Sequence, residues 1–221
     1  MAKMYWNTVK PLLQQALLQL MELPELHPFR LVGGTALSLQ HGHRISVDID
    51  LFTDADYGSI NFDRIEHILS ELFTYLEKVS SGPVGMGRSY FLGMDRENTI
   101  KLDLFYTTDP FMQDPLHEEG IRMATTEEII AMKVDVIQRG GRKKDFFDLY
   151  ELLPHYPIGR MLELHALRYP YSHDLTLIVT NFTQFEDADT DFDPECLRGR
   201  YWEFIKEDFE ITLQEYRSRN L

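Results

Sequence analysis

The sequence has little cysteine, no excess of positive charge and no long apolar run. Cys196 is the only cysteine among 221 residues, so no intrachain disulfide can form and a reducing compartment suits the chain. No stretch approaches the length of a membrane span, and the N-terminal "MAKMYWNTVKPLLQQALLQLMEL" lacks the continuous apolar core and cleavage site of a signal peptide. We therefore expect a cytoplasmic protein with no membrane partner.

Acidic residues outnumber basic ones, 36 to 22, which gives a formal net charge of -14. This balance argues against a protein that coats nucleic acid nonspecifically, because a polyanion is repelled at long range. A local basic surface is still open to the chain, since "QRGGRKK" at residues 138–144 gathers four basic side chains. Hydrophobic residues make up 43% of the chain, which is enough for a globular core.

Predicted strands concentrate before residue 110 and predicted helices after it. In the first half we expect helices over residues 4–22, 35–41 and 61–79, and strands at 29–32, at 44–52 and on both sides of the polar turn "DREN". In the second half, "TTEEIIAMKVDVIQ" and "RKKDFFDLYELL" predict helices. This layout indicates an α+β class, with a strand-rich half at 1–110 and a mainly helical half at 111–221.

Three aspartates stand out because apolar residues flank each of them on a predicted strand. Asp48 and Asp50 alternate with apolar residues in "SVDIDLF", so both point to one face, and Asp103 lies in "IKLDLF". A carboxylate pair with a third carboxylate on a neighbouring strand suits a hard divalent cation such as Mg²⁺. Alternatively, the D-x-D pattern is the solvent-facing side of an edge strand.

Gly33 and Gly34 come directly after a predicted strand and before a predicted helix. Glycine lets backbone amides approach phosphate oxygens, a helix N-terminus favours anions, and Thr35 adds a hydroxyl donor. Taken alone, the glycine pair is a turn. The order of strand, Gly-Gly, helix and D-x-D strand indicates a functional site more specifically than either motif does alone.

At these residues the sequence resembles a known family. "VGGTAL" followed by "HRISVDIDLF" is similar to the nucleotidyltransferases of the DNA polymerase β superfamily, and most closely to the AbiEii/AbiGii toxin-like group. That group carries a later lysine and a K-D-x-x-D-L element, which Lys133 and residues 144–149 match. The resemblance implies a polymerase β-like mixed sheet with flanking helices, followed by a helical C-terminal half.

The resemblance also implies an activity and a set of site residues. The activity is transfer of a nucleoside monophosphate from an NTP, with Mg²⁺ or Mn²⁺, to an acceptor such as tRNA or another RNA. Its setting is a toxin–antitoxin or abortive-infection system with a cognate antitoxin. The implied catalytic metal ligands are Asp48, Asp50 and Asp103; the implied nucleotide-binding residues are Gly33, Gly34, Thr35, Arg44, Ser46, Lys133, Lys144, Asp145 and Asp148.

The helical element and its neighbours admit other interpretations. Lys133 either solvates a helix face or pairs with triphosphate oxygens, and Asp145 either complements the helix dipole or belongs to the site. Asp148 lies deeper in its helix, so we expect it to orient a lysine or an arginine. We expect Arg44 to neutralise the acidic cluster or contact phosphate, and we interpret His41 and His43 as polar residues at the rim.

Two further segments carry charge. We expect Arg139, Arg142 and Lys143 to face the acceptor; alternatively, these bases offset nearby acidic residues on a solvated surface. We expect "DADTDFDPE" at 187–195 to be a solvated acidic loop, because it lacks the glycine and the glutamate of a calcium-binding EF-hand.

Two other functions remain open. One is a non-catalytic nucleotide- or partner-binding module on the same fold, and the other is a metal-dependent phosphodiesterase.

Overall fold

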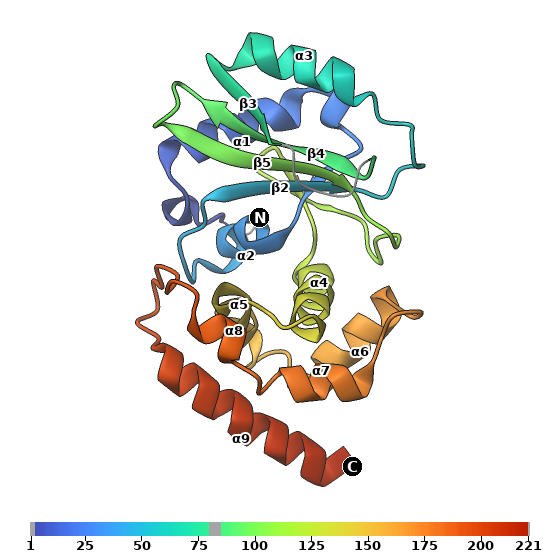
Figure 1. The fold of residues 1–221 in the computed structure, drawn as a ribbon, viewed down its shortest axis with the longest axis vertical. Coiled ribbons are helices and arrows are strands. Elements are labelled where there is room, and N and C mark those ends of the chain that lie inside the picture. Colours follow the sequence, from blue (N-terminus) through green and yellow to red (C-terminus); the bar gives the residue numbers. More distant parts are fainter. Residues whose placement is uncertain (1–2, 80–84, 221) are drawn as a thin grey trace. The chain divides into compact units, whose positions relative to one another are not determined.

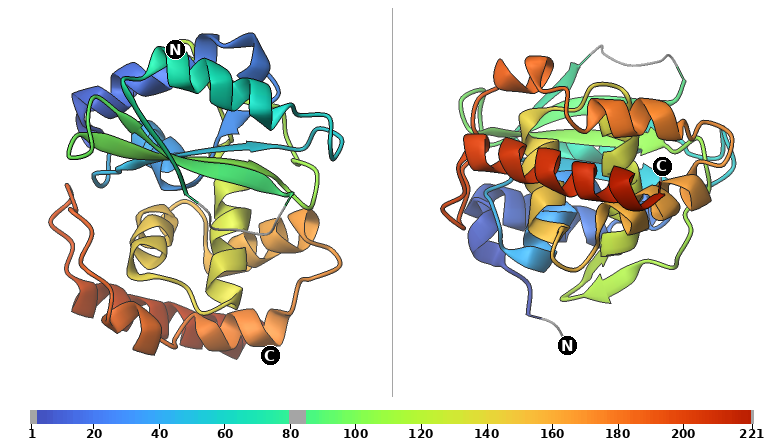
Figure 2. Two further views of the ribbon diagram at one scale, coloured as in Figure 1. Left: turned by 45° about the horizontal axis from the view of Figure 1, so that its top comes forward. Right: turned by 90° about the horizontal axis from the view of Figure 1, so that it is seen from below.

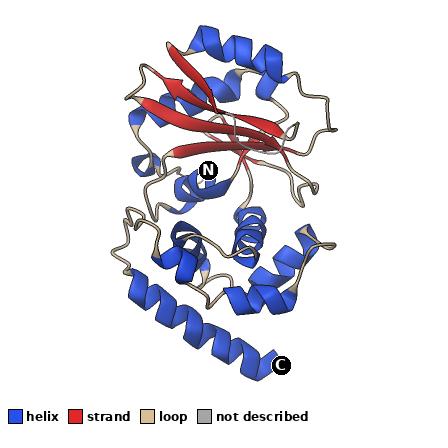
Figure 3. Cartoon of the chain, viewed as in Figure 1, coloured by secondary structure: helices blue, strands red, loops and turns tan. Residues whose placement is uncertain are grey.

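A computed structural model describes residues 3–79 and 85–220. The chain divides into two compact units. The first contains the residues up to His41 together with Ser46–Thr125, and the second contains Gly42–Ile45 together with the chain from Thr126 onward. Among the described residues, every named strand belongs to the first unit and the second is helical (Figure 3).

The first unit is built on a seven-stranded mixed sheet with the strand order β3-β4-β5-β2-β1-β7-β6. Strand β2 pairs in parallel with β5, as does β1 with β7, and the other neighbours are antiparallel. The strands are β1 (Arg30–Leu31), β2 (Asp48–Thr53), β3 (Tyr75–Val79), β4 (Gly87–Gly93), β5 (Thr99–Tyr106), β6 (Leu116–Glu118) and β7 (Ile121–Met123).

Helices α1 and α3 lie against one face of this sheet (Figure 1). The helical elements of the unit are η1 (Trp6–Thr8), α1 (Pro11–Glu22), η2 (Pro24–Leu26), α2 (Gly33–His41) and α3 (Phe62–Leu72). Pro11 opens α1, where a missing amide hydrogen costs nothing, and the buried Leu13, Leu17 and Leu20 follow at helical spacing. Alternation along β2 and β5 buries the apolar residues and leaves the aspartates half-buried.

The expected helix over 61–79 is wrong in its second half. Helix α3 ends at Leu72 because Phe73 is extended, and Tyr75–Val79 forms the edge strand β3 against β4. Tyr and Val favour a pleated surface, and pairing with β4 satisfies the backbone. The short β6–β7 hairpin was not expected from the polar, proline-containing segment before residue 123.

The second unit packs its helices around α4. Helix α4 contacts α5, α6 and α7, and α9 crosses α5 and α6 (Figure 2). The helices are α4 (Thr126–Gln138), α5 (Lys143–Leu152), α6 (Ile158–Arg168), α7 (Leu175–Asn181), α8 (Glu186–Asp189) and α9 (Trp202–Asn220). Phe146 of α5 lies at the centre of an aromatic cluster, with ring centroids 5.2 Å from Phe185, 5.6 Å from Trp202 and 5.8 Å from Phe209. No helix of the described ranges is both long and apolar enough to cross a membrane.

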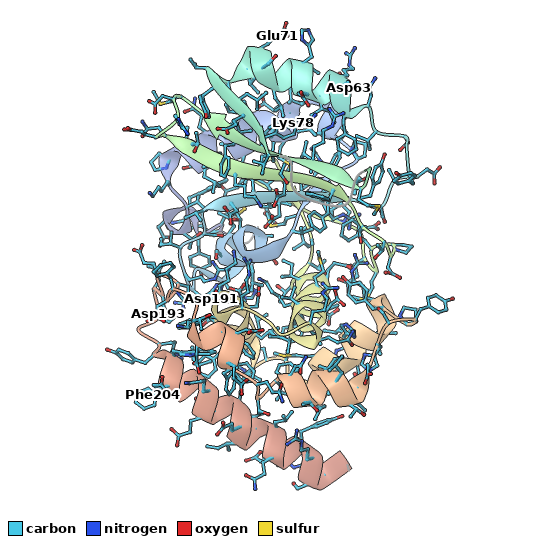
Figure 4. The ribbon with its side chains drawn as sticks, viewed as in Figure 1. Asp63, Glu71, Lys78, Asp191, Asp193 and Phe204 are labelled. Atoms are coloured by element: carbon cyan, nitrogen blue, oxygen red, sulfur yellow. The ribbon has the colours of Figure 1, made fainter. Side chains whose placement is uncertain are left out.

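Two phenylalanines of the second unit provide a matched pair for testing this packing. We expect Phe146→Ala to lower the free energy of unfolding by about 3–5 kcal/mol, because it opens a cavity in the aromatic cluster. Phe204 of α9 is 61% exposed (Figure 4), so Phe204→Ala is expected to change it by less than about 0.5 kcal/mol. Urea titration followed by far-UV circular dichroism measures both; similar losses in the two variants would contradict this packing.

Candidate functional site

The three predicted carboxylates lie on neighbouring strands of the first unit. Strands β2 and β5 pair in parallel with Asp50 opposite Asp103, and Asp48 opposite Lys101. Paired residues of a parallel ladder point to the same face, and residues two apart along a strand do so as well. The register therefore brings Asp48, Asp50 and Asp103 to one face of the sheet.

A lysine shares this face, and sequence reasoning missed it. Lys101 Nζ lies 2.6 Å from Asp103 Oδ2. Burial alone would lower the pKa of Lys101, but the hydrogen bond to Asp103 and the negative charges of Asp103, Asp48 and Asp50 raise it above its ordinary value. The signal was present in the sequence, because a residue two positions before Asp103 on a strand must share its face.

The cluster does not contain a completed metal site. Within residues 3–79 and 85–220, no three His, Cys, Asp or Glu side chains are already gathered so that they could hold a metal ion. Asp103 Oδ1, however, is buried and accepts no hydrogen bond within that part of the chain. A buried carboxylate oxygen without a donor is suited to a cation, so the residues present fit a divalent ion that arrives from outside.

The glycine pair opens helix α2 beside these carboxylates. Gly33 has a φ of +66°, which favours glycine, and a Cβ on it would lie 2.8 Å from Asp50 Oδ2. The first amides of a helix have no partner within the helix and favour an anion. The fold thus places the N-terminus of α2 against the Asp50 carboxylate.

Thr35 and Ser46 are buried, so their hydroxyls are engaged inside the first unit. Thr35 Oγ1 lies 2.8 Å from Ser46 Oγ and forms a second hydrogen bond with the carbonyl of Asp48. These contacts join the first turn of α2 to the start of the D-x-D strand. The structure therefore supports a positioning role for both residues at the glycine turn.

In the second unit, Asp148 is the centre of a buried ionic network. Arg44 holds its carboxylate through two nitrogens, with Nε 2.6 Å from Oδ1 and Nη2 2.9 Å from Oδ2. Lys133 Nζ lies 2.7 Å from Asp148 Oδ2 and also pairs with Asp145. The expectation that Asp148 orients a lysine or an arginine agrees with these contacts, and Lys133 does not solvate a helix face.

His43 completes this network, and the interpretation of His43 as a rim residue is wrong. Its side chain is buried, and its Nε2 lies 2.8 Å from Asp148 Oδ1. Burial alone would raise the pKa of Asp148, but the charges of Arg44 and Lys133 and the hydrogen bonds from His43 and Arg44 hold it well below its ordinary value. An ionised carboxylate only accepts hydrogen bonds, so His43 Nε2 carries the proton.

The segment Gly42–Ile45 is held in the second unit by its backbone as well. Ile45 N donates to the carbonyl of Glu195 at 2.9 Å, and Leu197 N donates to the carbonyl of His43 at 2.8 Å. A β-bridge joins Arg44 to Cys196. Residues far apart in the sequence therefore fix the two side chains that hold Asp148.

The basic segment 138–144, which runs into the first turn of α5, contains both buried and exposed side chains. Lys143 is 5% exposed, and its Nζ contacts the carbonyl of Asp191 at 2.7 Å and Asp193 Oδ1 at 2.9 Å; Figure 4 labels both aspartates. Lys143 is therefore not the solvent-facing acceptor contact that the sequence predicts, because acidic residues neutralise it. The side chains of Arg139 and Arg142 are 66% and 61% exposed, and Lys144 is half-buried.

Most acidic side chains of the segment 187–195 are exposed, as expected, but two of the aspartates also accept hydrogen bonds from other elements. Its first residues belong to α8, and Asp189 accepts hydrogen bonds from Trp202 Nε1 at 2.6 Å and from Lys206 at 3.0 Å. Lys143 N donates to Asp191 Oδ2 at 3.0 Å. The aspartates of this segment therefore receive donors from α5 and α9.

Comparison with known proteins extends over nearly the whole chain. Residues 15–219 match the family described as "Nucleotidyl transferase AbiEii toxin, Type IV TA system". A protein of Aquifex aeolicus (strain VF5), described as uncharacterized, is 29% identical over 214 residues, which cover 92% of this chain and 95% of its own.

Solved structures share the fold at low sequence identity. A putative nucleotidyltransferase from H. pylori superposes with a TM-score of 0.60 at 22% identity and covers 94% of this chain and 92% of its own. The nucleotidyltransferase toxin MenT4 from Mycobacterium tuberculosis H37Rv gives 0.54 at 15% identity, covering 92% and 83%. These likenesses confirm the α+β nucleotidyltransferase fold that the sequence resemblance implies.

Removing the central carboxylate of the buried network is expected to destabilise the protein. Asp148→Asn would leave Arg44 and Lys133 buried without this partner, and we expect a loss of about 3–5 kcal/mol in the free energy of unfolding. Asp193→Asn is the control, because that side chain is 72% exposed and is expected to contribute under about 1 kcal/mol. Urea denaturation at pH 7 measures both, and equal midpoints would contradict the network.

The depressed pKa of Asp148 predicts how this stabilisation depends on pH. Since the folded pKa lies below the unfolded value of about 3.9, the contribution is present above about pH 4 and is lost as pH falls through the folded pKa. The gap in unfolding free energy between wild type and Asp148→Asn should therefore shrink from pH 7 to pH 3. Urea titrations at several pH values test this, and a gap that stays constant would show that Asp148 carries no such shift.

Proposed function

Because the chain belongs to the nucleotidyl transferase AbiEii toxin family of type IV toxin–antitoxin systems, we propose that it transfers a nucleoside monophosphate from an NTP to an RNA acceptor. An acceptor oxygen forms a bond to the α-phosphorus while the bond to pyrophosphate breaks. A tRNA is the first acceptor to test. NTPs and RNA are cytoplasmic, so we place the reaction in the cytoplasm, under the control of a cognate antitoxin.

The observation that carries the proposal is the contact between two parts of one site. Gly33, at the N-terminus of α2, lies so close to the Asp50 carboxylate that a Cβ would collide with Oδ2 at 2.8 Å. A nuclease needs the carboxylates alone, whereas a transferase also needs a place for the triphosphate that it cleaves. The amides of Gly33 and Gly34 supply that place beside the carboxylates.

The family chemistry uses a divalent cation, and we propose Asp48, Asp50 and Asp103 as its ligands. The shared face and the buried, donor-free Oδ1 of Asp103 support this assignment. Bound Mg²⁺ or Mn²⁺ would neutralise phosphate charge and stabilise the attacking and leaving oxygens. Thr35 and Ser46 hold the turn and the strand together while these groups bind.

Lys133 and the K-D-x-x-D-L element at residues 144–149 receive divided roles in this proposal. The buried pairs of Lys133, Asp145, Asp148 and Arg44 support a structural task, because their charges satisfy one another. Lys144 remains the proposed contact to the triphosphate, and the exposed Arg139 and Arg142 the proposed contacts to RNA. A chain with a net charge of -14 needs such a locally positive surface to hold a polyanion.

The central test is Asp50→Asn in a transfer assay. With each α-labelled NTP, Mg²⁺ and total RNA, wild type should move label into RNA and release pyrophosphate, and chelation of Mg²⁺ should stop it. We expect the variant to lose on the order of 10²-fold or more in kcat, because one metal-binding charge is gone while the fold is kept.

The matched control is Asp56→Asn, three residues beyond β2, where the side chain is exposed. It should retain wild-type activity, and circular dichroism should show that both variants are folded. Full activity in folded Asp50→Asn would refute a catalytic D-x-D motif. RNA shortening without label transfer would identify a phosphodiesterase, and neither reaction by wild type would favour a non-catalytic module.

A further inference from the structure

Lys101 lies inside the carboxylate cluster and is part of neither the family motif nor the proposed ligand set. In the sheet it lies between two strands, opposite Asp48 on β2 and opposite Phe91 on β4. Its ammonium pairs with Asp103 Oδ2 at 2.6 Å. The neighbour on the β4 side is apolar, so the register directs the ammonium toward the aspartates.

The charges of this face explain why a cation is needed there. Three carboxylates on adjacent strands repel one another, and like charges directly opposite each other, such as those of Asp50 and Asp103, destabilise a strand pair. Lys101 supplies a positive charge to this face, where it pairs with Asp103. The cluster is therefore folded with a partial countercharge in place, and it keeps Asp103 Oδ1 without a donor.

The exposure of Lys101 distinguishes it from a buried structural lysine. Its side chain is 37% exposed, whereas that of Lys133 in the ionic network is 8% exposed. A long, partly solvated side chain can swing away from Asp103, but breaking the pair costs free energy, because the Asp103 side chain is only 16% exposed. Among the described residues, no ready group of three ligands exists, and Asp103 is engaged by Lys101 instead.

We propose that Lys101 is a built-in countercharge that competes with the divalent cation for Asp103 and so weakens binding of the metal alone. The inference rests on the proposed role of the three aspartates as metal ligands. Because Lys101 must leave Asp103 before the ion binds there, the cluster takes up metal efficiently only with the triphosphate, whose oxygens add ligands. Lys101 is thus a positioning residue that sets metal affinity.

The test measures Mn²⁺ binding without nucleotide or RNA, by electron paramagnetic resonance of the free ion. We expect Lys101→Met to bind Mn²⁺ at least tenfold more tightly than wild type, a change of about 1.4 kcal/mol. Lys101→Arg keeps the charge and should stay near wild type. Lys78→Met is the matched control, because Lys78 of β3 pairs with Glu66 of α3 at 3.0 Å and is 49% exposed.

The direction of the change separates this role from a structural one. A lysine that only supports the fold would weaken Mn²⁺ binding when removed, whereas a competitor strengthens it. Lys101→Gln, which keeps a polar side chain, provides the same measurement if the methionine variant does not fold. Binding that is unchanged or weaker in both variants, or absent from all the proteins, overturns the inference. Tighter binding without any nucleotidyl transfer would uphold it and refute the proposed function instead.

Discussion

The repulsion among three carboxylates on one face of a parallel strand pair is the constraint on which the site depends. The β2–β5 register puts Asp50 beside Asp103, and no shift of a single residue keeps both the aspartates and the buried apolar rows in place. The same alternation that builds the core thus collects negative charge on the other face. In the proposed function a cation and the triphosphate would neutralise that charge, and Lys101 already pairs with Asp103.

The two units use lysine in different ways. Lys133 is nearly fully buried between Asp145 and Asp148, so its position is fixed by charges that also hold Arg44. Such a network is costly to break, because removing one partner leaves a buried charge without compensation. Lys101 has one close carboxylate partner and partial solvent access. Burial therefore distinguishes Lys133, which joins α4 to α5, from Lys101, which we propose a metal ion displaces from Asp103.

Sequence patterns predicted what depends on local periodicity and motifs. Turn residues between two alternating segments predicted the β4–β5 hairpin, and helical spacing predicted α5. Alternation along β2 and β5 predicted that the aspartates share one face of the sheet. Strand β3 at Tyr75–Val79 was not predictable, because so short an amphipathic stretch fits both the helical and the strand periodicity. Its pairing with β4 decides for the strand. The partners of Asp148 were equally hidden, since His43 and Arg44 lie over 100 residues away in sequence.

Because Gly42–Ile45 belongs to the second unit, a C-terminal fragment of the protein does not contain the whole helical unit. A fragment starting at Thr126 would contain α4 to α9 but would omit the donors that Asp148 receives from this segment. The backbone hydrogen-bond partners of Glu195 and Leu197, and the β-bridge partner of Cys196, would be missing as well. The helical unit is therefore built from two separate stretches of the sequence. A fragment that holds only the C-terminal stretch would leave Asp148 buried without the positive charge of Arg44. A fragment cut at Thr126 would therefore lack Gly42–Ile45, the segment that completes the helical unit.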